Sequence, residues 1–502
     1  MAVKQVGQFE ALAWRWIRKR VQAGRVSDLA LAVMMVILGA PVGSGAQMQP
    51  PFRLQMNPSS AENPFYGSVT AHRSGAQALR LSLDDAIGRG LENNLALKES
   101  EASVRVVQGQ RLEAMQLLLP TIRLNGSTAY HQVNLRAMGF GPAILTKLGL
   151  PKNTPYITRA DVNQGAIVYS QTLFSGPVMD ALKGVAALRQ AADFERMETR
   201  NKVVQQVAAT YLAALAAASQ VDNAKALEAA DRALFDQTHE KHAAGVVANL
   251  DELRARVEMQ AQQQRVIATE NSLAKYLIFL KREIGIDSGQ AVELTDRTPY
   301  NDLAARTPAE VCAEAYRNRQ DYQSLKAQVV EARAESSGYK HQRWPTLSFN
   351  GDYAVTAVNG AGTHGNFAAV GRLSFPIFRE ASLRGDVHVA EAKLMSARYQ
   401  LANLTTEIDQ QVRSALLDVE ASSKLVLVAR SNVELSQQAL RDETDRVNAG
   451  IDDNLPLVQA QSALAAAETN RVESLYQYNL AKLSLAQATG VVEQQYRVYL
   501  GR

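Results

Sequence analysis

The heptapeptide PTIRLNG, at residues 120–126, returns with small changes as PTLSFNG at residues 345–351. Each copy ends a long, mostly polar segment and begins one in which apolar and polar residues alternate. The same spacing of 225 residues also aligns DDAIGRGLENN, at 84–94, with AEVCAEAYRNR, at 309–319. The sequence therefore predicts that the chain contains two copies of one structural unit.

The repeat continues along the chain with a small change of spacing. The offset falls to 204 where Phe174 matches Phe378, and it is 205 where Gly285 matches Gly490. The halves differ chiefly by about twenty residues in one loop, which includes LTKLGLPKNTPY at 145–156. The predicted first unit is 81–295, with a hairpin at 120–174 and a helical turn near 245. The predicted second unit is 296–492, with a hairpin at 345–378 and a helical turn near 450. A C-terminal tail is predicted at 493–502.

Long helices are predicted by segments that lack glycine and proline. These segments are 185–244, 246–284, 386–449 and 457–489, and apolar residues recur in them at spacings of three and four. A helix over 178–243 would be about 99 Å long, and helices over 249–284 and 97–118 would add about 54 Å and 33 Å, at 1.5 Å per residue. We expect each unit to pack one long helix against two shorter coaxial ones, as in a coiled coil.

The N-terminus is typical of an exported protein. The basic stretch RWIRKR, at 15–20, precedes an apolar run at 29–40 and the small residues VGSGA at 42–46. Because that run is shorter than the roughly 20 residues that span a bilayer, we predict a secretory signal peptide at 1–46, with a retained anchor as the alternative. Residues 47–80 are expected to form an extended segment.

Charge and cysteine content exclude several classes of function. Removing the six basic and two acidic residues of 1–46 from totals of 54 and 50 leaves 48 of each, so the mature chain has no excess positive charge for binding nucleic acid. The single cysteine, Cys312, cannot form a disulfide within the chain, and no cysteine near the predicted cleavage site could accept a lipid.

Four segments alternate with the period of a β-strand, and each has one apolar face. The residues predicted to face lipid are Ile122, Leu124, Tyr169, Leu173, Leu347, Phe349, Leu373 and Phe375. One interpretation is a soluble sheet covered by a helix. The other is a membrane sheet, which is favoured by the export signal, by Tyr130 and Trp344 near strand ends, and by helices too long to fold back over the strands.

Four strands cannot close a barrel by themselves. Unpaired backbone amides cost several kcal/mol each in hydrocarbon, so an open sheet edge is not tolerated there. If the sheet lies in a membrane, the protein must therefore associate with copies of itself.

No catalytic, cofactor-binding or metal-binding residues are predicted. The motif HEKH, at 239–242, offers two imidazoles without a third ligand, and a solvated helix face is the simpler interpretation. The glycine patches at 139–141 and 359–362 lie between paired strands and lack a following Walker lysine, so they are expected to be loops.

Taken together, these motifs resemble those of the TolC-like outer membrane efflux proteins. The resemblance covers about 81–492, and it includes LSLDDAIGRGLENNLAL, LLLPTIRLNG, RWPTLSFNG, AGVVANLDELRARVEM and AGIDDNLPLVQAQSAL in order. It implies a mainly α-helical protein with a membrane β-barrel portion. In such a protein three copies contribute four strands each to one twelve-stranded outer membrane barrel, which a coiled-coil helical barrel extends through the periplasm.

The resemblance also implies a function and partners. The protein would be a passive exit duct, supplied by a proton-driven or ATP-driven inner membrane pump through a periplasmic adaptor. The cargo stays open among drugs, metal ions and proteins. The alternatives are a periplasmic coiled-coil or adaptor protein without its own pore, and an exported enzyme on a helical scaffold.

Family positions at the periplasmic tip carry over residue by residue. Those matching the helical reversals and expected to contact the adaptor are Gly245, Asn249, Leu250, Gly450, Asn454 and Leu455. Asp251 matches an acidic position of the first turn that narrows the pore in the family. At the second turn, Pro456 and Gln459 stand where aspartates ring the pore in the best-known member, so the family's gate contacts do not simply carry over. We hypothesise that Asp452 and Asp453 form an alternative acidic ring; the other interpretation is that they only end one helix and cap the next.

Overall fold

The structure is a computed structural model that describes residues 59–69, 75, 77–149, 151, 154–358, 362–449 and 454–501, without the side chains of Asn448 and Asn454. All of these residues belong to one compact unit, Met56–Arg502. The predicted signal peptide at 1–46 lies outside the described residues. The elements are η1 (Pro64–Tyr66), β1 (Leu79–Leu81), α3 (Leu83–Asn93), α4 (Leu95–Gln116), β2 (Thr121–Asn134), α5 (Pro142–Lys147), β3 (Ile157–Phe174), α6 (Gly176–Ala243), α7 (Asn249–Ile284), β4 (Val292–Leu294), α8 (Pro308–Asn318), α9 (Gln320–His341), β5 (Thr346–Val358), β6 (Gly362–Ser374), α10 (Glu380–Asn448), α11 (Asn454–Ala488) and α12 (Val492–Leu500).

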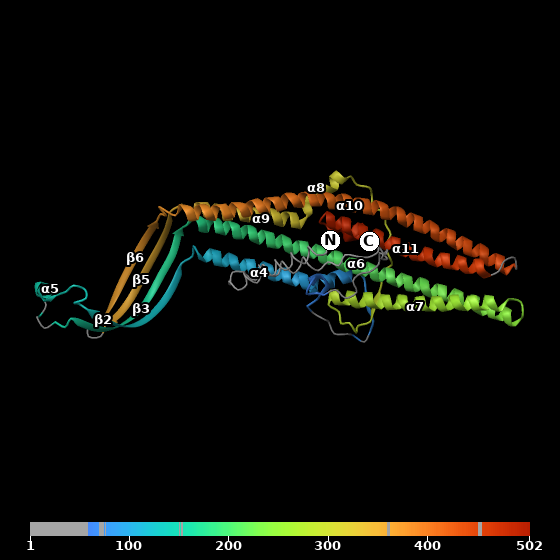
Figure 1. The fold of residues 1–502 in the computed structure, drawn as a ribbon, viewed down its shortest axis with the longest axis horizontal. Helices are drawn as coiled ribbons and strands as arrows, with labels where there is room; N and C mark the ends of the chain where they lie inside the picture. Colours follow the sequence, from blue (N-terminus) through green and yellow to red (C-terminus); the bar gives the residue numbers. More distant parts are fainter. Residues whose placement is uncertain are drawn as a thin grey trace, which may run out of the picture. The chain divides into compact units, whose positions relative to one another are not determined.

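Two helices of 68 and 69 residues, α6 and α10, form the framework of the unit. Helix α6 packs against α4 near its start and against α7 towards its end, while α10 packs in the same way against α9 and α11 (Figure 1). The expected pairing of one long helix with two shorter ones is confirmed in both halves. Helix α9 also packs on α6, and this contact joins the halves.

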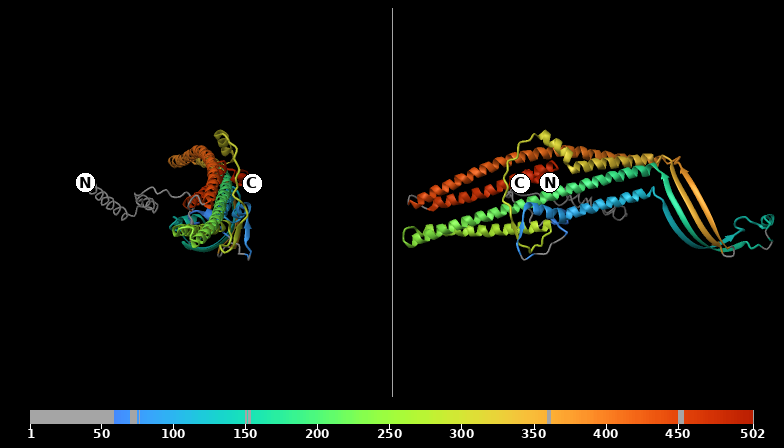
Figure 2. Two further views of the ribbon diagram at one scale, coloured as in Figure 1. Left: turned by 90° about the vertical axis from the view of Figure 1, so that its right-hand side faces the viewer. Right: turned by 180° about the vertical axis from the view of Figure 1, so that it is seen from behind.

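The four long strands form one antiparallel sheet in the order β2-β3-β5-β6. The hairpins β2–β3 and β5–β6 meet through β3 and β5, so β2 and β6 are the two edges. Among the described elements, no helix packs extensively on either face of this sheet. In this unit the sheet lies at one end of the long helices, and the α6–α7 reversal lies at the other (Figures 1 and 2).

The core lies where the middle of α6 meets the shorter helices. The stretch ATYLAALAAASQV, at 209–221, contributes side chains small enough for close helix packing, and Ala213, Ala214 and Ala216 are almost fully buried. Among the described residues, none of the helices combines the length and the apolar composition needed to cross a bilayer.

Several short elements around this core differ from the sequence-based expectation. Strands β1 and β4 form a two-stranded parallel sheet, and the hydroxyl of Tyr211 on α6 donates to the carbonyl of Leu81 at 2.9 Å. Helix α12 begins at Val492 and covers most of the predicted C-terminal tail, and Tyr496, Tyr499 and Leu500 in it are buried. Three-residue strands and a nine-residue helix are too short to leave a clear periodicity in the sequence.

Candidate functional site

Most of the large apolar residues of the four long strands lie on one face of the sheet. Directly opposite residues in an antiparallel sheet share a face, and Ile122 lies opposite Tyr169, Leu124 opposite Ile167, and Leu347 opposite Leu373. Phe349 lies opposite Gln171, and the Phe349 ring meets the Tyr169 ring edge-on at 5.8 Å between centroids. The two hairpins therefore present one continuous apolar face.

This apolar face is open to its surroundings. The exposed fractions of Ile122, Leu124 and Leu373 are 67%, 81% and 61%. Single exposed apolar residues are common on soluble proteins, but a contiguous exposed apolar surface marks an interaction with lipid or protein. The face therefore needs an apolar partner beyond the residues that the structure describes.

Two of the predicted lipid-facing residues lie outside the regular ladder. Leu173 lies at an irregularity of the β3–β5 pairing, between Thr172 and Phe174. Strand β6 ends at Ser374, so Phe375 lies beyond it and the predicted hairpin at 345–378 is shorter than expected. Pro376 has no backbone N–H, which explains why the ladder does not continue through this stretch.

The first helical reversal is built around a left-handed glycine. Helix α6 ends at Ala243, and Gly245 has φ of 75°, with no atom within 4 Å of the position that a Cβ would take. The Val246 amide donates to the Lys241 carbonyl at 2.9 Å, which satisfies a carbonyl at the helix end. Gly245 is thus required by its backbone conformation rather than by lack of space.

The residues that follow are exposed at the same end of the unit. Asn249 begins α7, and the side chain of Leu250 is 56% exposed. Asp251 lies in the first turn of α7, and its Oδ1 is 3.5 Å from Nη1 of Arg254. The positive charge of Arg254 therefore offsets the charge of Asp251, the acidic residue that the family resemblance assigns to the pore.

The second reversal is described only in part. Gly450, Asp452 and Asp453 lie outside the described residues, as does the side chain of Asn454. Helix α10 ends at Asn448, α11 begins at Asn454, and Leu455 is 41% exposed.

The HEKH motif contributes to a cluster of polar contacts across the first reversal. His239 Nδ1 donates to Glu252 Oε1 at 2.9 Å, and His242 Nε2 lies 3.8 Å from Glu252 Oε2. The hydrogen bond from His239 lowers the pKa of Glu252 below its usual value. No group of three or more His, Cys, Asp or Glu side chains suited to a metal ion occurs among the described residues.

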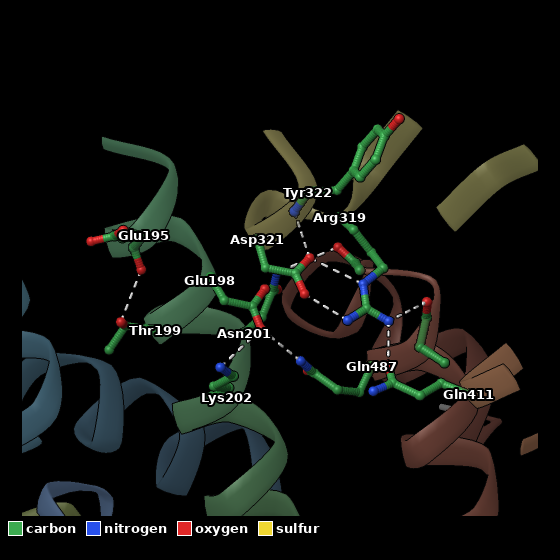
Figure 3. Close-up of polar contacts among 12 residues, drawn as sticks. Glu195, Glu198, Thr199, Asn201, Lys202, Arg319, Asp321, Tyr322, Gln411 and Gln487 are labelled. Carbon is green, nitrogen blue, oxygen red and sulfur yellow. Dashed lines mark hydrogen bonds and ion pairs between the residues drawn. The ribbon is translucent and has the colours of Figure 1, made fainter. Parts of the chain in front are cut away.

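A polar network joins the two halves, and sequence reasoning did not identify it (Figure 3). The guanidinium of Arg319, between α8 and α9, donates two hydrogen bonds to Asp321, at 3.1 and 2.6 Å. It also donates to Gln411 Oε1 on α10, at 2.6 Å, and to the carbonyl of Ala488 on α11, at 3.5 Å. Burial would raise the pKa of Asp321, but the hydrogen bonds and charge of Arg319 outweigh burial and lower it.

The same network reaches the long helix of the first half. Glu198 on α6 accepts a hydrogen bond from Gln487 on α11 at 3.0 Å, and Nζ of Lys202 lies 3.5 Å from Oε1 of Glu198 (Figure 3). Burial raises the pKa of Glu198 despite the nearby lysine. Asn201 donates to the carbonyl of Gly490 at 3.4 Å. These contacts fix the two long helix pairs to each other.

The corresponding place in the first half holds a buried acid. Glu283, near the end of α7, is fully buried, and its Oε1 accepts from Gln206 Nε2 of α6 at 2.9 Å. Burial raises the pKa of Glu283 to about 8. The carboxyl group is therefore largely protonated at neutral pH.

Sequence comparison with known proteins places these features in context. The family described as "Outer membrane efflux protein" matches residues 86–285 and 311–491. The toluene efflux pump outer membrane protein TtgC of Pseudomonas putida is 24% identical over an alignment of 502 residues, covering 92% of this chain and 95% of TtgC.

A second relative is matched over a shorter stretch. Nodulation protein T of Rhizobium leguminosarum bv. trifolii is 22% identical over 252 residues, so the match covers 49% of this chain and about half, 54%, of that relative.

Comparison with solved structures gives the same fold. The Campylobacter jejuni CmeC outer membrane channel superposes with a TM-score of 0.69 at 15% identity, over 86% of this chain and 92% of CmeC. The fold prediction of long helices combined with four strands is confirmed.

Proposed function

The chain belongs to the outer membrane efflux protein family, and from this premise we propose that it forms the outer membrane exit channel of a tripartite export system. It conducts solutes passively from the periplasmic side to the exterior and catalyses no reaction. Its sheet lies in the outer membrane and its helices extend into the periplasm.

The observation that carries this proposal is the exposed apolar face of the sheet. Lipid is the partner that fits it, because the face is contiguous over two hairpins and no helix of the described chain covers it. The opposite face carries polar and small residues, including Asn125, Ser170 and Asn350, which suit contact with water. A sheet with these two faces can separate lipid from an aqueous pore.

The edges of the sheet require more than one copy. Among the described residues, strands β2 and β6 each have one side without a neighbouring strand. Unpaired amides are costly in hydrocarbon, so β6 of one copy pairs with β2 of the next. Three copies then form a barrel of twelve strands.

The helices supply the periplasmic part of the channel. At the end far from the sheet, the residues that meet the periplasmic adaptor are Gly245, Asn249, Leu250, Gly450, Asn454 and Leu455. The adaptor connects the channel to an inner membrane pump, either proton-driven or ATP-driven. Asp251, Asp452 and Asp453 are the candidates for the acidic constriction.

Two matched substitutions test the assignment of the sheet faces. Leu124→Lys places a charge on the apolar face, and Asn125→Lys places the same charge on the other face of the same strand. A lysine facing lipid costs from about 0–1 kcal/mol near the interface to about 4 kcal/mol at the bilayer centre, so Leu124→Lys should assemble less well in the outer membrane than Asn125→Lys. Asn125→Lys should retain assembly and form ion-conducting pores in planar bilayers.

The measurements are the amount of protein in the outer membrane fraction and the single-channel conductance of the purified protein. Release of the unmodified chain from cells without detergent would contradict the proposal. Equal assembly of both lysine variants would also contradict it.

A further inference from the structure

The polar face of the sheet carries more positive than negative charge. Arg123 lies opposite Val168, and Val168 lies opposite Asp352, so these side chains share one face. Arg372 lies opposite Ser348, four residues along β5 from Asp352, and therefore shares that face. Two arginines and one aspartate are the only Arg, Lys, Asp or Glu residues on this face of the four described strands.

The polar face is also the more enclosed face of the sheet. Along β5, Ala354 is only 2% exposed on the polar side, whereas its neighbour Tyr353 is 52% exposed on the apolar side. Ser348, Asn350 and Asp352 are likewise half-buried. Because none of the described helices packs extensively on the sheet, this difference indicates that the sheet curves towards its polar face. Closing the sheet along this curvature places the polar face inside.

The arginine charges are not neutralised within the part of the chain that the structure describes. Neither Arg123 nor Arg372 forms an ion pair or side-chain hydrogen bond with another described residue, and both are exposed. His131 and His364 lie on the same face. The two arginines and Asp352 of each copy together add a net charge of +1 to the inner surface.

We propose that the lumen of the sheet favours anionic solutes and that Arg123 and Arg372 determine this preference. The inference rests on the proposed function, since it needs the sheet to close around water. In a three-copy barrel six arginines face three copies of Asp352. Rings of fixed charge surrounded by a low-dielectric wall raise the local concentration of counter-ions, and this sets the ion preference of a pore.

The other face of the same sheet provides a matched control. Arg159 lies opposite Gln132, on the face that carries Ile122 and Leu124. Arg159→Gln removes the same charge as Arg123→Gln, but on the outer side of the barrel. Its effect on ion preference should therefore be small.

The experiment measures reversal potentials of the full-length protein in planar bilayers across a potassium chloride gradient. It uses pH 8 and low salt, because screening lengths shrink from about 30 Å at 0.01 M to 3 Å at 1 M. The Arg123→Gln, Arg372→Gln variant should lower the chloride-to-potassium permeability ratio by roughly twofold or more. Asp352→Asn should raise the ratio, and Arg159→Gln should leave it near the unmodified value.

A second measurement covers the case in which the helical end offers most of the resistance. Inorganic pyrophosphate is added to each side of the bilayer in turn, and block from the sheet side should weaken in the double arginine variant. The inference is wrong if the variants conduct but neither selectivity nor block changes. It is also wrong if all three variants shift the permeability ratio in the same direction. In both cases the proposed channel function is unaffected. If the unmodified protein forms no pores, the proposed function fails and the inference fails with it.

Discussion

In both halves of the chain a left-handed glycine follows the last long helix. The buried polar groups beside the two glycines differ: one is an acid and the other is an arginine with its partners. Helix α7 ends at Ile284 and is followed by Gly285, and α11 ends at Ala488, two residues before Gly490; the two glycines have φ of 74° and 75°. Next to the first glycine, Gln206 donates to the buried carboxyl of Glu283. Next to the second, Gln411 accepts from Arg319, and Asp321 balances the charge.

The difference shows that backbone geometry leaves the choice of buried polar group open. A buried acid without a cation is stable only when protonated, whereas a buried ion pair remains charged and depends on both partners. We call the contact of Gln206 with Glu283 the first junction, and the contacts of Arg319 with Gln411 and Asp321 the second junction. We expect the stability of the first junction to depend on pH, and that of the second to depend on the presence of both charged partners.

The largest effect is expected from Gly490→Ala. An added Cβ would lie 2.8 Å from the Arg319 Cα and 2.9 Å from its amide nitrogen, in addition to the strain of the left-handed conformation. We predict a loss of about 5 kcal/mol in the free energy of unfolding, measured by denaturant titration of the helical circular dichroism signal.

Gly245→Ala is the control for this change. Gly245 has the same φ of 75° as Gly490, but the position of the added Cβ lies in open space. The substitution should therefore cost only about 1–2 kcal/mol of backbone strain. Equal losses for the two variants would show that contact with Arg319 does not matter.

Removing the cation of the second junction should have the next largest effect. Arg319→Leu leaves Asp321 without its bidentate partner and Gln411 without a donor, and the expected loss is about 4 kcal/mol. Arg319→Lys keeps the charge but not the fork of hydrogen bonds, so it should recover part of the loss. A denaturant midpoint unchanged in both variants would refute this account of the second junction.

The first junction should make stability depend on pH. Because the pKa of Glu283 is raised in the folded state to about 8 from 4.5, its contribution is fully present below pH 4.5 and is lost as the pH rises to about 8. The unfolded state ionises first, so the loss between pH 5 and 8 is about 3 kcal/mol per copy.

Glu283→Gln should remove this dependence while retaining an acceptor for Gln206. The free energies of unfolding of the variant and the unmodified protein are compared at pH 5 and at pH 8. The two should diverge at the higher pH, with the variant more stable. Parallel pH profiles would mean that Glu283 is not the responsible group.

The smallest effect concerns the helical reversals. Asp251 is paired with Arg254, so the double substitution Asp251→Asn, Arg254→Gln removes no net charge and should change the ion selectivity of the pore little. If Asp452 and Asp453 form an acidic ring, their double substitution to asparagine should lower the preference for cations at that end. Unchanged selectivity in planar bilayers would leave them the simpler role of ending and capping helices.

Much of the architecture was predictable because it depends on local patterns. A helix over 249–284 was expected from the absence of breakers, and α7 has these bounds. The long helix expected to begin at 178 begins at Gly176, since proline is well suited to the first turn of a helix. Alternation likewise identified four strands and placed Ile122 and Leu347 on their apolar sides.

The junctions could not be predicted in the same way because their partners are distant in sequence. Arg319 and Gln411 are 92 residues apart, and Gln206 and Glu283 are 77 apart. The convergence of His239 on Glu252 depends on how the reversal turns the two helices. A glutamate inside the apolar run YLIFLKREIGI, at 276–286, was the available hint of a buried acid.

The central claim is that neighbouring copies complete the sheet, and cross-linking between its edges tests this most directly. Cys312 is first replaced by serine, and one cysteine is then introduced at Asn125 in β2 and a second at successive positions of β6. The account predicts disulfide-linked oligomers of up to three copies in outer membranes, formed at one narrow set of β6 positions. Membrane-inserted protein that stays monomeric at every β6 position would contradict it.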